Sequence, residues 1–305
     1  MGEDMRTAGV IVTYNRKELL YQNIISLMEQ TVPLDVIIII DNCSTDGTKE
    51  FLQEKGFLDR KDIIYKALSQ NLGGAGGFYY GTKEAYDLGY DFAWLMDDDG
   101  RPYCLNTFER VIITAKELYV NNPLLLLNSL VVCDNNTLAF GLGGYNSVEK
   151  FITNVAGNIY INKINPFNGT LVSKELMQSI GFPNKDFFIK GDEVDYTIRA
   201  KKVGAYVATV IDSLYYHPII EVRYRKILWK NFKIMYEPPW KQYYRARNHS
   251  YIYISNKKYI RLVKDIAWMS KNIILSNKNV ISGIRMMIFG VFDGVKGKLG
   301  ATVKP

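Results

Sequence analysis

The strongest constraint on this sequence is a repeated order of short apolar runs and amphipathic segments over its first hundred residues. Four runs rich in Val, Ile and Ala alternate with segments whose apolar residues recur at helical spacing. Strands that are apolar throughout are typical of a parallel sheet with helices on both faces. The order therefore predicts an α/β fold with a doubly wound sheet. The expected strands are residues 8–13, 36–40, 63–67 and 92–96.

Polar residues or glycines follow each expected strand, at the edge where such a sheet binds its ligands. Thr13 and Arg16 follow the first strand, and Asp41 ends the second. The Asp41 carboxylate can accept the ring N–H of uracil or thymine, with a helix cap as the alternative. After the third strand, Asn71 and Gly73 open a glycine-rich run that brings backbone N–H groups to a helix N-terminus. That arrangement suits anionic oxygens, and close helix packing explains it equally well.

Three carboxylates, Asp97, Asp98 and Asp99, follow the fourth strand. Adjacent carboxylates repel one another, so the cluster predicts a bound cation, and hard oxygen ligands suit Mg²⁺ or Mn²⁺. Because side chains alternate along a strand, we expect Asp97 and Asp99 to face the site and Asp98 to point away. His217, one of two histidines, is the expected further ligand. A solvated acidic turn is the alternative, which the buried strand before it disfavours.

A second acidic cluster contains Asp192 and Glu193 and precedes a helical segment at 196–202. Carboxylates at a helix start are stabilised by the helix dipole, which alone could explain them. The functional alternative is a general base that takes the proton from an acceptor hydroxyl. Further helices are expected at residues 16–29, 73–88, 105–119 and 259–274.

Charge divides the chain near residue 218. Residues 1–218 contain 20 Lys and Arg against 27 Asp and Glu, whereas residues 219–305 contain 18 against 4. The sequence thus predicts a catalytic domain at 1–218 and a basic, mainly helical C-terminal region at 219–305. A basic region on an acidic body suggests a polyanionic partner, either nucleic acid or anionic lipid.

Two features bear on where the protein works. The sequence opens without a charged-then-apolar leader, and no apolar run reaches the ~18 residues that span a bilayer. Its three cysteines are scattered, which argues against a disulfide framework and favours a reducing compartment. We therefore expect a cytoplasmic protein, peripheral at the inner face of the cell membrane if the basic region binds lipid.

Six motifs in a fixed order resemble family 2 glycosyltransferases of the GT-A fold. The resemblance covers about residues 8–218 and continues more loosely to YYRARN at 243–248. Within the family, the chain looks most like bacterial galactofuranosyltransferases. The motifs are VTYNR at 12–16, DNCSTDGT at 41–48, NLGGAGGF at 71–78, WLMDDDG at 94–100, GDEVDYTIRAKKVG at 191–204 and YHP at 216–218.

The resemblance implies a Rossmann-like nucleotide-sugar-binding domain and an inverting, metal-dependent transfer from UDP-galactofuranose to a glycan or lipid-linked glycan. It implies Mn²⁺ or Mg²⁺ as cofactor and the base within the Asp192–Glu193 pair. A Glu stands at 193 where the family usually has Asp. The residues implied to bind the nucleotide-sugar are Thr13, Arg16, Asp41, Asn71, Gly73, Asp97 and Asp98. Those implied to bind the metal are Asp97, Asp99 and His217, and those implied to bind the acceptor are Asn168, Gly169 and Thr170.

Several alternatives remain open from the sequence. Polymerising relatives have an aromatic pair after Asn168-Gly169, where this chain has Thr170 and Leu171, so we expect one or a few additions. A dTDP-rhamnose donor would offer Asp41 the same imide edge as UDP. A nucleotidyltransferase would need a glycine-rich loop and a lysine after the first strand, and nucleic acid would be repelled by the acidic strand ends. Two alternatives remain: a non-catalytic sugar-binding protein, and a basic tail that packs on the catalytic domain or on another copy of the chain.

Overall fold

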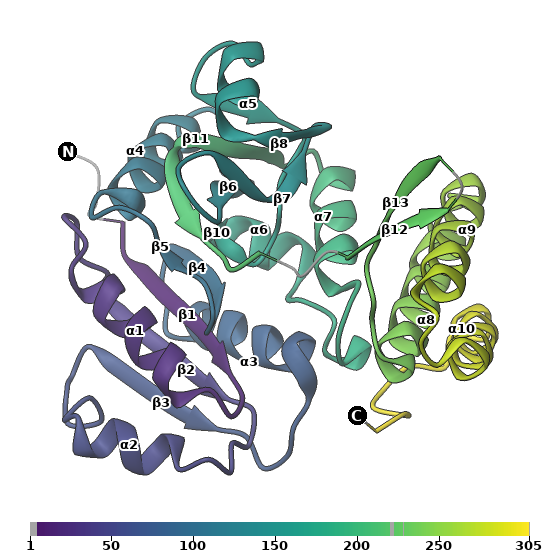
Figure 1. Ribbon diagram of the computed structural model, residues 1–305. Coiled ribbons are helices and arrows are strands. Elements are labelled where there is room, and N and C mark those ends of the chain that lie inside the picture. The colour runs from purple at the N-terminus through teal and green to yellow at the C-terminus, as the bar shows by residue number, and fades with distance from the viewer. Residues whose placement is uncertain (1–4, 220–222, 228, 305) are drawn as a thin grey trace. The chain divides into compact units, whose positions relative to one another are not determined.

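The computed structural model describes residues 5–219, 223–227 and 229–304, which form two compact units (Figure 1). The first unit comprises Met1–Pro183 and Tyr196–Ile219. The second comprises Asn184–Asp195 and Ile220–Pro305. The division at Ile219 lies next to the expected boundary at 218. The short segment 184–195 groups with the second unit, although it precedes that boundary.

The first unit is built on one mixed sheet. Its first part is parallel, in the order β3-β2-β1-β4, and each of these strands is an apolar run of the kind described above. Beyond β4 the order continues β10-β6-β11-β5, with β10 antiparallel to both of its neighbours. The strands of this path are β1 Thr7–Thr13, β2 Val36–Asp41, β3 Ile63–Ala67, β4 Phe92–Asp97, β5 Arg101–Pro102, β6 Leu125–Val132, β10 Asn168–Ser173 and β11 Tyr206–Tyr216.

Helices cover both faces of this sheet, as strands that are buried on both sides require. Alternate residues of β2 divide between the two cores, with Ile37 and Ile39 on one side and Ile38 and Ile40 on the other. The first core includes α1 Lys17–Met28, α2 Thr48–Glu54 and α4 Thr107–Tyr119. The second includes α3 Gly73–Asp87, α6 Lys174–Ile180 and the later part of α7 Asp192–Lys202.

Smaller elements complete the first unit around the far end of β6. They enclose a third apolar cluster around Phe151. These elements are β7 Thr137–Leu142, β8 Tyr145–Ser147, α5 Val148–Asn154 and β9 Ile159–Ile161.

The second unit is mainly helical. It contains η1 Lys185–Phe187, the hairpin β12 Arg223–Ile227 and β13 Lys230–Ile234, and the helices α8 Pro239–Ser255, α9 Tyr259–Ser276 and α10 Val280–Val295. α10 approaches α8 closely through glycines, since a Cβ on Gly290 would lie 2.4 Å from the carbonyl oxygen of Tyr243. Within the described residues, no helix combines the length and apolar character needed to cross a membrane.

The predicted fold class is confirmed, and the first four strands agree with the predicted ranges to within one residue. Three details differ from the sequence prediction. The sheet is mixed beyond β4, α7 begins at Asp192, and a hairpin precedes the basic helices. The hairpin strands carry a basic residue at nearly every second position, so their apolar signal is weak.

Candidate active site

One arginine pairs with two of the three carboxylates at the end of β4. Nη1 of Arg16 lies 3.0 Å from Oδ1 of Asp98 and 2.8 Å from Oδ2 of Asp99. Asp98 and Asp99 therefore both turn a carboxylate oxygen toward Arg16. β4 ends at Asp97, so the alternation of a strand does not continue into the turn. The Arg16 side chain is 49% exposed, so solvent reaches this cation.

Asp98 also fixes the end of β1. Its Oδ2 accepts a hydrogen bond of 2.8 Å from the Thr13 hydroxyl and one of 3.3 Å from the Tyr14 N–H. Burial raises the pKa of Asp98, and the nearby Arg16 charge and the Thr13 hydroxyl offset part of that rise. The β1–β4 register places Val12 opposite Asp97, so these ends lie at one edge of the sheet.

His217, just beyond β11, lies against the same cluster. Its Nε2 is 3.6 Å from Oδ1 of Asp99, and its ring packs 4.8 Å from that of Phe140. Its Nδ1 lies 2.7 Å from the Pro218 carbonyl oxygen. A carbonyl only accepts, so Nδ1 carries the proton in this contact, and Nε2 is the ring nitrogen that faces the carboxylate.

These residues fit a divalent cation by their donor chemistry. A carboxylate oxygen and an imidazole nitrogen face each other, and both are ligand types of divalent-cation sites. Among the described residues, no three His, Cys, Asp or Glu side chains are already grouped as a metal site. Arg16 is the cation that bridges Asp98 and Asp99. Arg16 is half exposed, whereas the Asp98 side chain is 5% exposed, so a cation that displaced Arg16 would have to compensate a buried carboxylate.

Asp41 ends β2 at the same edge, because Thr13 pairs with it across β1 and β2. It is 3% exposed. Its Oδ1 accepts the Ser44 N–H at 2.8 Å, and its Oδ2 accepts the Tyr65 hydroxyl at 2.5 Å. Each carboxylate oxygen has a second lone pair, so Asp41 can still accept another N–H.

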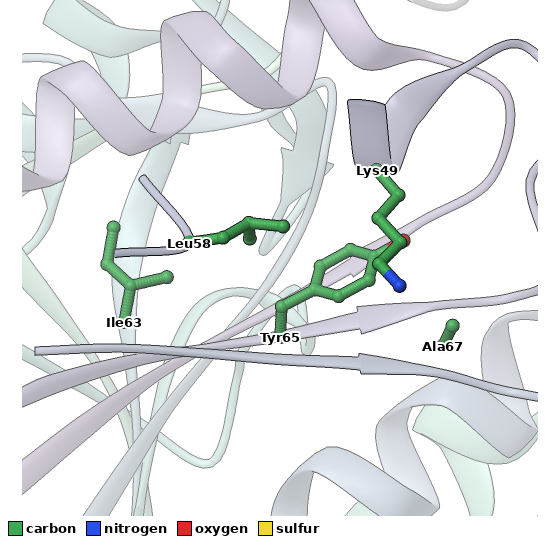
Figure 2. Close-up of a pocket in the computed structure, with 5 residues that line it drawn as sticks. All are labelled: Lys49, Leu58, Ile63, Tyr65 and Ala67. Carbon is green, nitrogen blue, oxygen red and sulfur yellow. The ribbon is translucent and has the colours of Figure 1, made fainter. Parts of the chain in front are cut away.

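A cavity of about 340 Å³ adjoins Asp41 through Tyr65. In Figure 2 the Lys49 nitrogen and the Tyr65 hydroxyl lie near each other. The apolar side chains of Leu58 and Ile63 lie on the other side of the Tyr65 ring. Burial, followed by the bond to Asp41, raises the pKa of Tyr65 well above its ordinary value, so this phenol stays a hydrogen-bond donor. The cavity thus has a polar end, linked to Asp41, and an apolar end.

The glycine-rich run has two different parts. Oδ1 of Asn71 accepts the Gly73 N–H at 2.7 Å, which starts α3. Gly77 serves close packing, because a Cβ there would lie 2.3 Å from Cγ1 of Val12. A Cβ on Gly74 would meet nothing within 4 Å. The open helix start at Gly73 and Gly74 is therefore the part that a ligand can approach.

The expected acceptor residues begin β10. Gly169 has φ +68°, and a Cβ there would lie 2.6 Å from the Tyr215 ring. The Thr170 side chain is fully buried, and its hydroxyl donates to Oδ1 of Asn128 at 2.5 Å and accepts the Phe167 N–H at 2.6 Å. Oδ1 of Asn168 is buried and has no hydrogen-bond partner among the described residues. Thr170 thus fixes the turn, and Oδ1 of Asn168 can accept a further hydrogen bond.

The second acidic cluster lies in the second unit, at the start of α7. Oε2 of Glu193 accepts the Gly191 N–H at 2.8 Å, and the carbonyl oxygen of Gly191 accepts the Asp195 N–H at 2.8 Å. Asp192 is 5% exposed. The carboxylates therefore lie at a helix start, where the helix dipole stabilises them. Their turn is also fixed by hydrogen bonds to Gly191.

Residues 10–110 match the family model described as "Glycosyl transferase family 2". This part of the chain is a family 2 glycosyltransferase domain. It contains β1 to β4, Arg16, Asp41 and Asp97–Asp99, the residues that meet at the carboxyl edge of the sheet.

Two curated relatives extend the likeness beyond that domain. Galactofuranosyltransferase GlfT1 of Mycobacterium tuberculosis is 28% identical over 254 residues, which cover 80% of this chain and 81% of that protein. The dTDP-rhamnosyl transferase RfbF of Shigella flexneri is 24% identical over 96% of each chain. Over most of its length the chain is therefore similar to galactofuranosyltransferases and, at lower identity, to a rhamnosyltransferase.

Solved structures support the fold. The crystal structure of GalNAc-T7 with UDP, GalNAc and Mn²⁺ matches with a TM-score of 0.59 and 15% identity. The match covers 84% of this chain and 51% of that chain, so this protein spans about half the length of GalNAc-T7. The GT-A fold predicted from the motifs is confirmed.

Several residues of the site were not predicted from the sequence. Tyr65 and Tyr215 contact it from β3 and β11, and Arg247 and Asn248 of α8 hold the loop before Asp192. The bonds from α8 cross about sixty positions of sequence, and the only signal was the YYRARN motif that extends the family resemblance.

Proposed function

We propose that this protein is an inverting, metal-dependent glycosyltransferase that moves galactofuranose from UDP-galactofuranose to a hydroxyl of a glycan or lipid-linked glycan. The observation that carries the proposal is the shared sheet edge. The pairing of β1 with β2 and β4 brings Asp41 and Asp97 beside Thr13 and Val12, with Arg16 and His217 on the same acidic cluster. The carboxylate that would bind the uracil and the cluster that would bind the cation then lie at one edge of the sheet. A nucleoside diphosphate with its cation requires both groups close together.

Each group has a role in the proposed reaction. Asp41 accepts the imide N–H of the uracil, and the open helix start at Gly73 and Gly74 together with Arg16 faces anionic oxygens. Asp97, Asp99 and His217 would hold Mn²⁺ or Mg²⁺, which when bound stabilises negative charge on the departing diphosphate. Asn168 and Gly169 orient the acceptor, and Thr170 keeps their turn in place.

Asp192 or Glu193 acts as the base. It takes the proton from the acceptor hydroxyl while the acceptor oxygen bonds to the anomeric carbon and the bond to the diphosphate oxygen breaks. One displacement changes the configuration once, so the product has the opposite anomeric form.

The identity of the donor is the part that needs a direct test. Similarity to GlfT1 supports galactofuranose, whereas similarity to RfbF over 96% of both chains supports dTDP-rhamnose as the second candidate. Incubation with Mn²⁺, octyl glycosides as acceptors and a panel of nucleotide-sugars would separate them. We expect UDP release only from UDP-galactofuranose. Release of dTDP from dTDP-rhamnose alone would replace the proposed donor, and no transfer from any donor would overturn the proposed activity.

We propose that the basic region binds an anionic membrane surface from the cytoplasmic side. Residues 257–304 contain ten Lys and Arg but only two acidic residues, Asp265 and Asp293. Both acids are partnered, because Asp265 accepts from His249 and Asp293 from Tyr243. Their side chains are less than a fifth exposed, so the outward charge of this region is basic.

α10 supplies an apolar stripe for such a surface. Ile281, Ile288, Phe292 and Val295 recur at helical spacing and are each more than half exposed. The other side of the helix packs on α8 through Gly290 and Gly294. An exposed apolar stripe with basic neighbours is typical of helices that lie in a lipid headgroup layer. Association of two copies through the same stripe is the alternative, and it would place like charges against each other.

A further inference from the structure

The loop that leads into Asp192 has an unusual backbone. Phe188 has φ +65°, Lys190 has φ +67° and Gly191 has φ +95°. Residues other than glycine seldom adopt this left-handed region, so a Phe and a Lys there require support from surrounding structure. Segment 186–191 is therefore held in place by contacts outside itself.

One asparagine of α8 supplies that support. Nδ2 of Asn248 lies 3.0 Å from the carbonyl oxygens of Phe187 and Ile189 and 2.6 Å from that of Lys190. The side chain is fully buried, so water does not replace these bonds if they are lost. Three carbonyl groups of one short loop thus converge on a single amide nitrogen and share its two N–H donors.

Arg247 fixes the orientation of that amide. Its Nε–H donates to Oδ1 of Asn248 at 2.8 Å, which turns Nδ2 toward the loop. Its Nη2 donates to the carbonyl oxygens of Asp186 at 3.2 Å and Phe187 at 3.0 Å. Its guanidinium also lies 4.7 Å from the ring centre of Tyr244. A planar fork with five donors can make these bonds together, whereas a lysine cannot.

Segment 300–303 joins the same network. Nη1 of Arg247 donates to the carbonyl oxygen of Gly300 at 2.5 Å, and the Gly300 N–H donates to that of Asp186 at 2.7 Å. The Tyr244 hydroxyl bonds both backbone groups of Val303. The loop is therefore enclosed by α8 on one side and by this segment on another.

The support reaches the carboxylates through Gly191. This residue follows Lys190, and its N–H and carbonyl groups hold Glu193 and Asp195 in the first turn of α7. A Cβ on Gly191 would lie 3.1 Å from Cβ of Asn248. A shift of Asn248 would therefore be transmitted to Asp192 and Glu193 within a few bonds.

We infer that Asn248, oriented by Arg247, is a positioning residue that sets the geometry of the Asp192–Glu193 base. The inference rests on the proposed function, since it assigns the purpose of this network to the proton transfer of that reaction. Asn248 acts through the loop and does not itself touch the reacting atoms.

The second unit contains a matched control residue. Asn272 is 5% exposed, and it accepts the Met235 N–H at 2.9 Å and donates to the Trp268 carbonyl oxygen at 2.8 Å. Asn272→Ala therefore removes a buried asparagine of the same unit without touching the loop. The comparison with Asn248→Ala separates lost stability from lost positioning.

The test measures kcat, donor Kd, melting temperature and amide hydrogen exchange of both variants. We expect Asn248→Ala to lower kcat on the order of 10²-fold, since small misplacements of a catalytic group have that effect. Donor Kd should stay unchanged, exchange across 186–193 should accelerate, and Asn272→Ala should keep its kcat at a similar loss of melting temperature. Arg247→Lys keeps the charge but cannot make the hydrogen bonds of Arg247 together, so it should also lower kcat.

Two results would overturn the inference in different ways. If Asn248→Ala loses no more kcat than Asn272→Ala, while Asp192→Asn or Glu193→Gln abolishes transfer, the base stands and only the positioning role fails. If neither Asp192→Asn nor Glu193→Gln slows transfer, the base assignment fails, and the positioning role fails with it.

Discussion

The two acidic clusters of this protein are held in opposite ways. Asp98 and Asp99 share the half-exposed cation of Arg16 at the end of a strand. Asp192 and Glu193 follow a loop that is held by a fully buried asparagine and arginine. Arg16 is solvated when it leaves its carboxylate partners, whereas the buried hydrogen bonds of Asn248 and Arg247 are costly to break. The first cluster is thus suited to changing its cation, and the second to keeping one geometry.

The largest effect should come from the first cluster. Asp99→Asn should lower transfer about 10³-fold, because stabilisation of the leaving diphosphate by a metal is worth several kcal/mol. EDTA should have the same effect on the wild type and little further effect on the variant. Asp62→Asn, which changes a surface pair with Arg60, is the control. Full activity in excess EDTA would show that this cluster needs no exchangeable cation.

The next largest effect is expected at the second cluster, when a carboxylate is replaced by an uncharged amide of the same shape. Glu193→Gln should lower kcat on the order of 10²-fold or more and leave donor Kd unchanged. If kcat is nearly normal in that variant and collapses in Asp192→Asn, the base is Asp192. NMR of the product checks the configuration, and a retained anomer would contradict a single displacement.

A smaller effect is expected at Asp41, which belongs to the same sheet edge as the first cluster. Asp41→Asn should weaken UDP binding by about 1–3 kcal/mol, because the amide would present N–H groups to an imide N–H. Calorimetric titration of UDP measures this change. Tyr65→Phe keeps the ring that lines the cavity and removes only the hydroxyl, so its effect should be smaller. Unchanged UDP affinity in Asp41→Asn would show that Asp41 does not bind the uracil.

The smallest effect is expected on the basic surface of the second unit. Lys296→Ala combined with Lys298→Ala should weaken binding to phosphatidylglycerol vesicles by about 1 kcal/mol per charge. High salt should weaken binding further, since exposed charges are screened within about 8 Å at physiological ionic strength. Lys61→Ala in the first unit is the control for sedimentation. Equal binding of the wild type to neutral and anionic vesicles would argue against an electrostatic role.

The sequence predicts those parts of the fold whose signal is local. β1, β2 and β4 are apolar runs because both of their faces are buried, and each can be identified without its partners. The antiparallel insertion of β10 beside β4 cannot, since it pairs Asn168 with Met96 across the chain. The β12–β13 hairpin is hidden by its basic residues, and only its pairing defines it.

The same distinction applies to the candidate site. Three successive carboxylates and a histidine are visible as a pattern, and the structure brings His217 to Asp99. The bridge from Arg16 to Asp98 is not visible, because it depends on where β4 ends. The residues that hold segment 186–191 cannot be recognised from the sequence, for a different reason. Asn248 is an ordinary polar residue of a helix until its carbonyl partners are known.

Asn248 is synthesised 61 positions after Phe187, whose carbonyl oxygen it binds. A ribosome adds about 5–20 residues per second. Asp41 and Asp97–Asp99 are therefore synthesised several seconds before Asn248. During that interval a nascent chain can order its nucleotide-sugar residues while segment 186–191 still lacks its anchor. On the proposed function, competence for proton transfer would thus follow donor binding as the chain folds. On the proposed function, a fragment that stops before α8 would still contain the donor-binding residues but would lack the side chain that anchors segment 186–191.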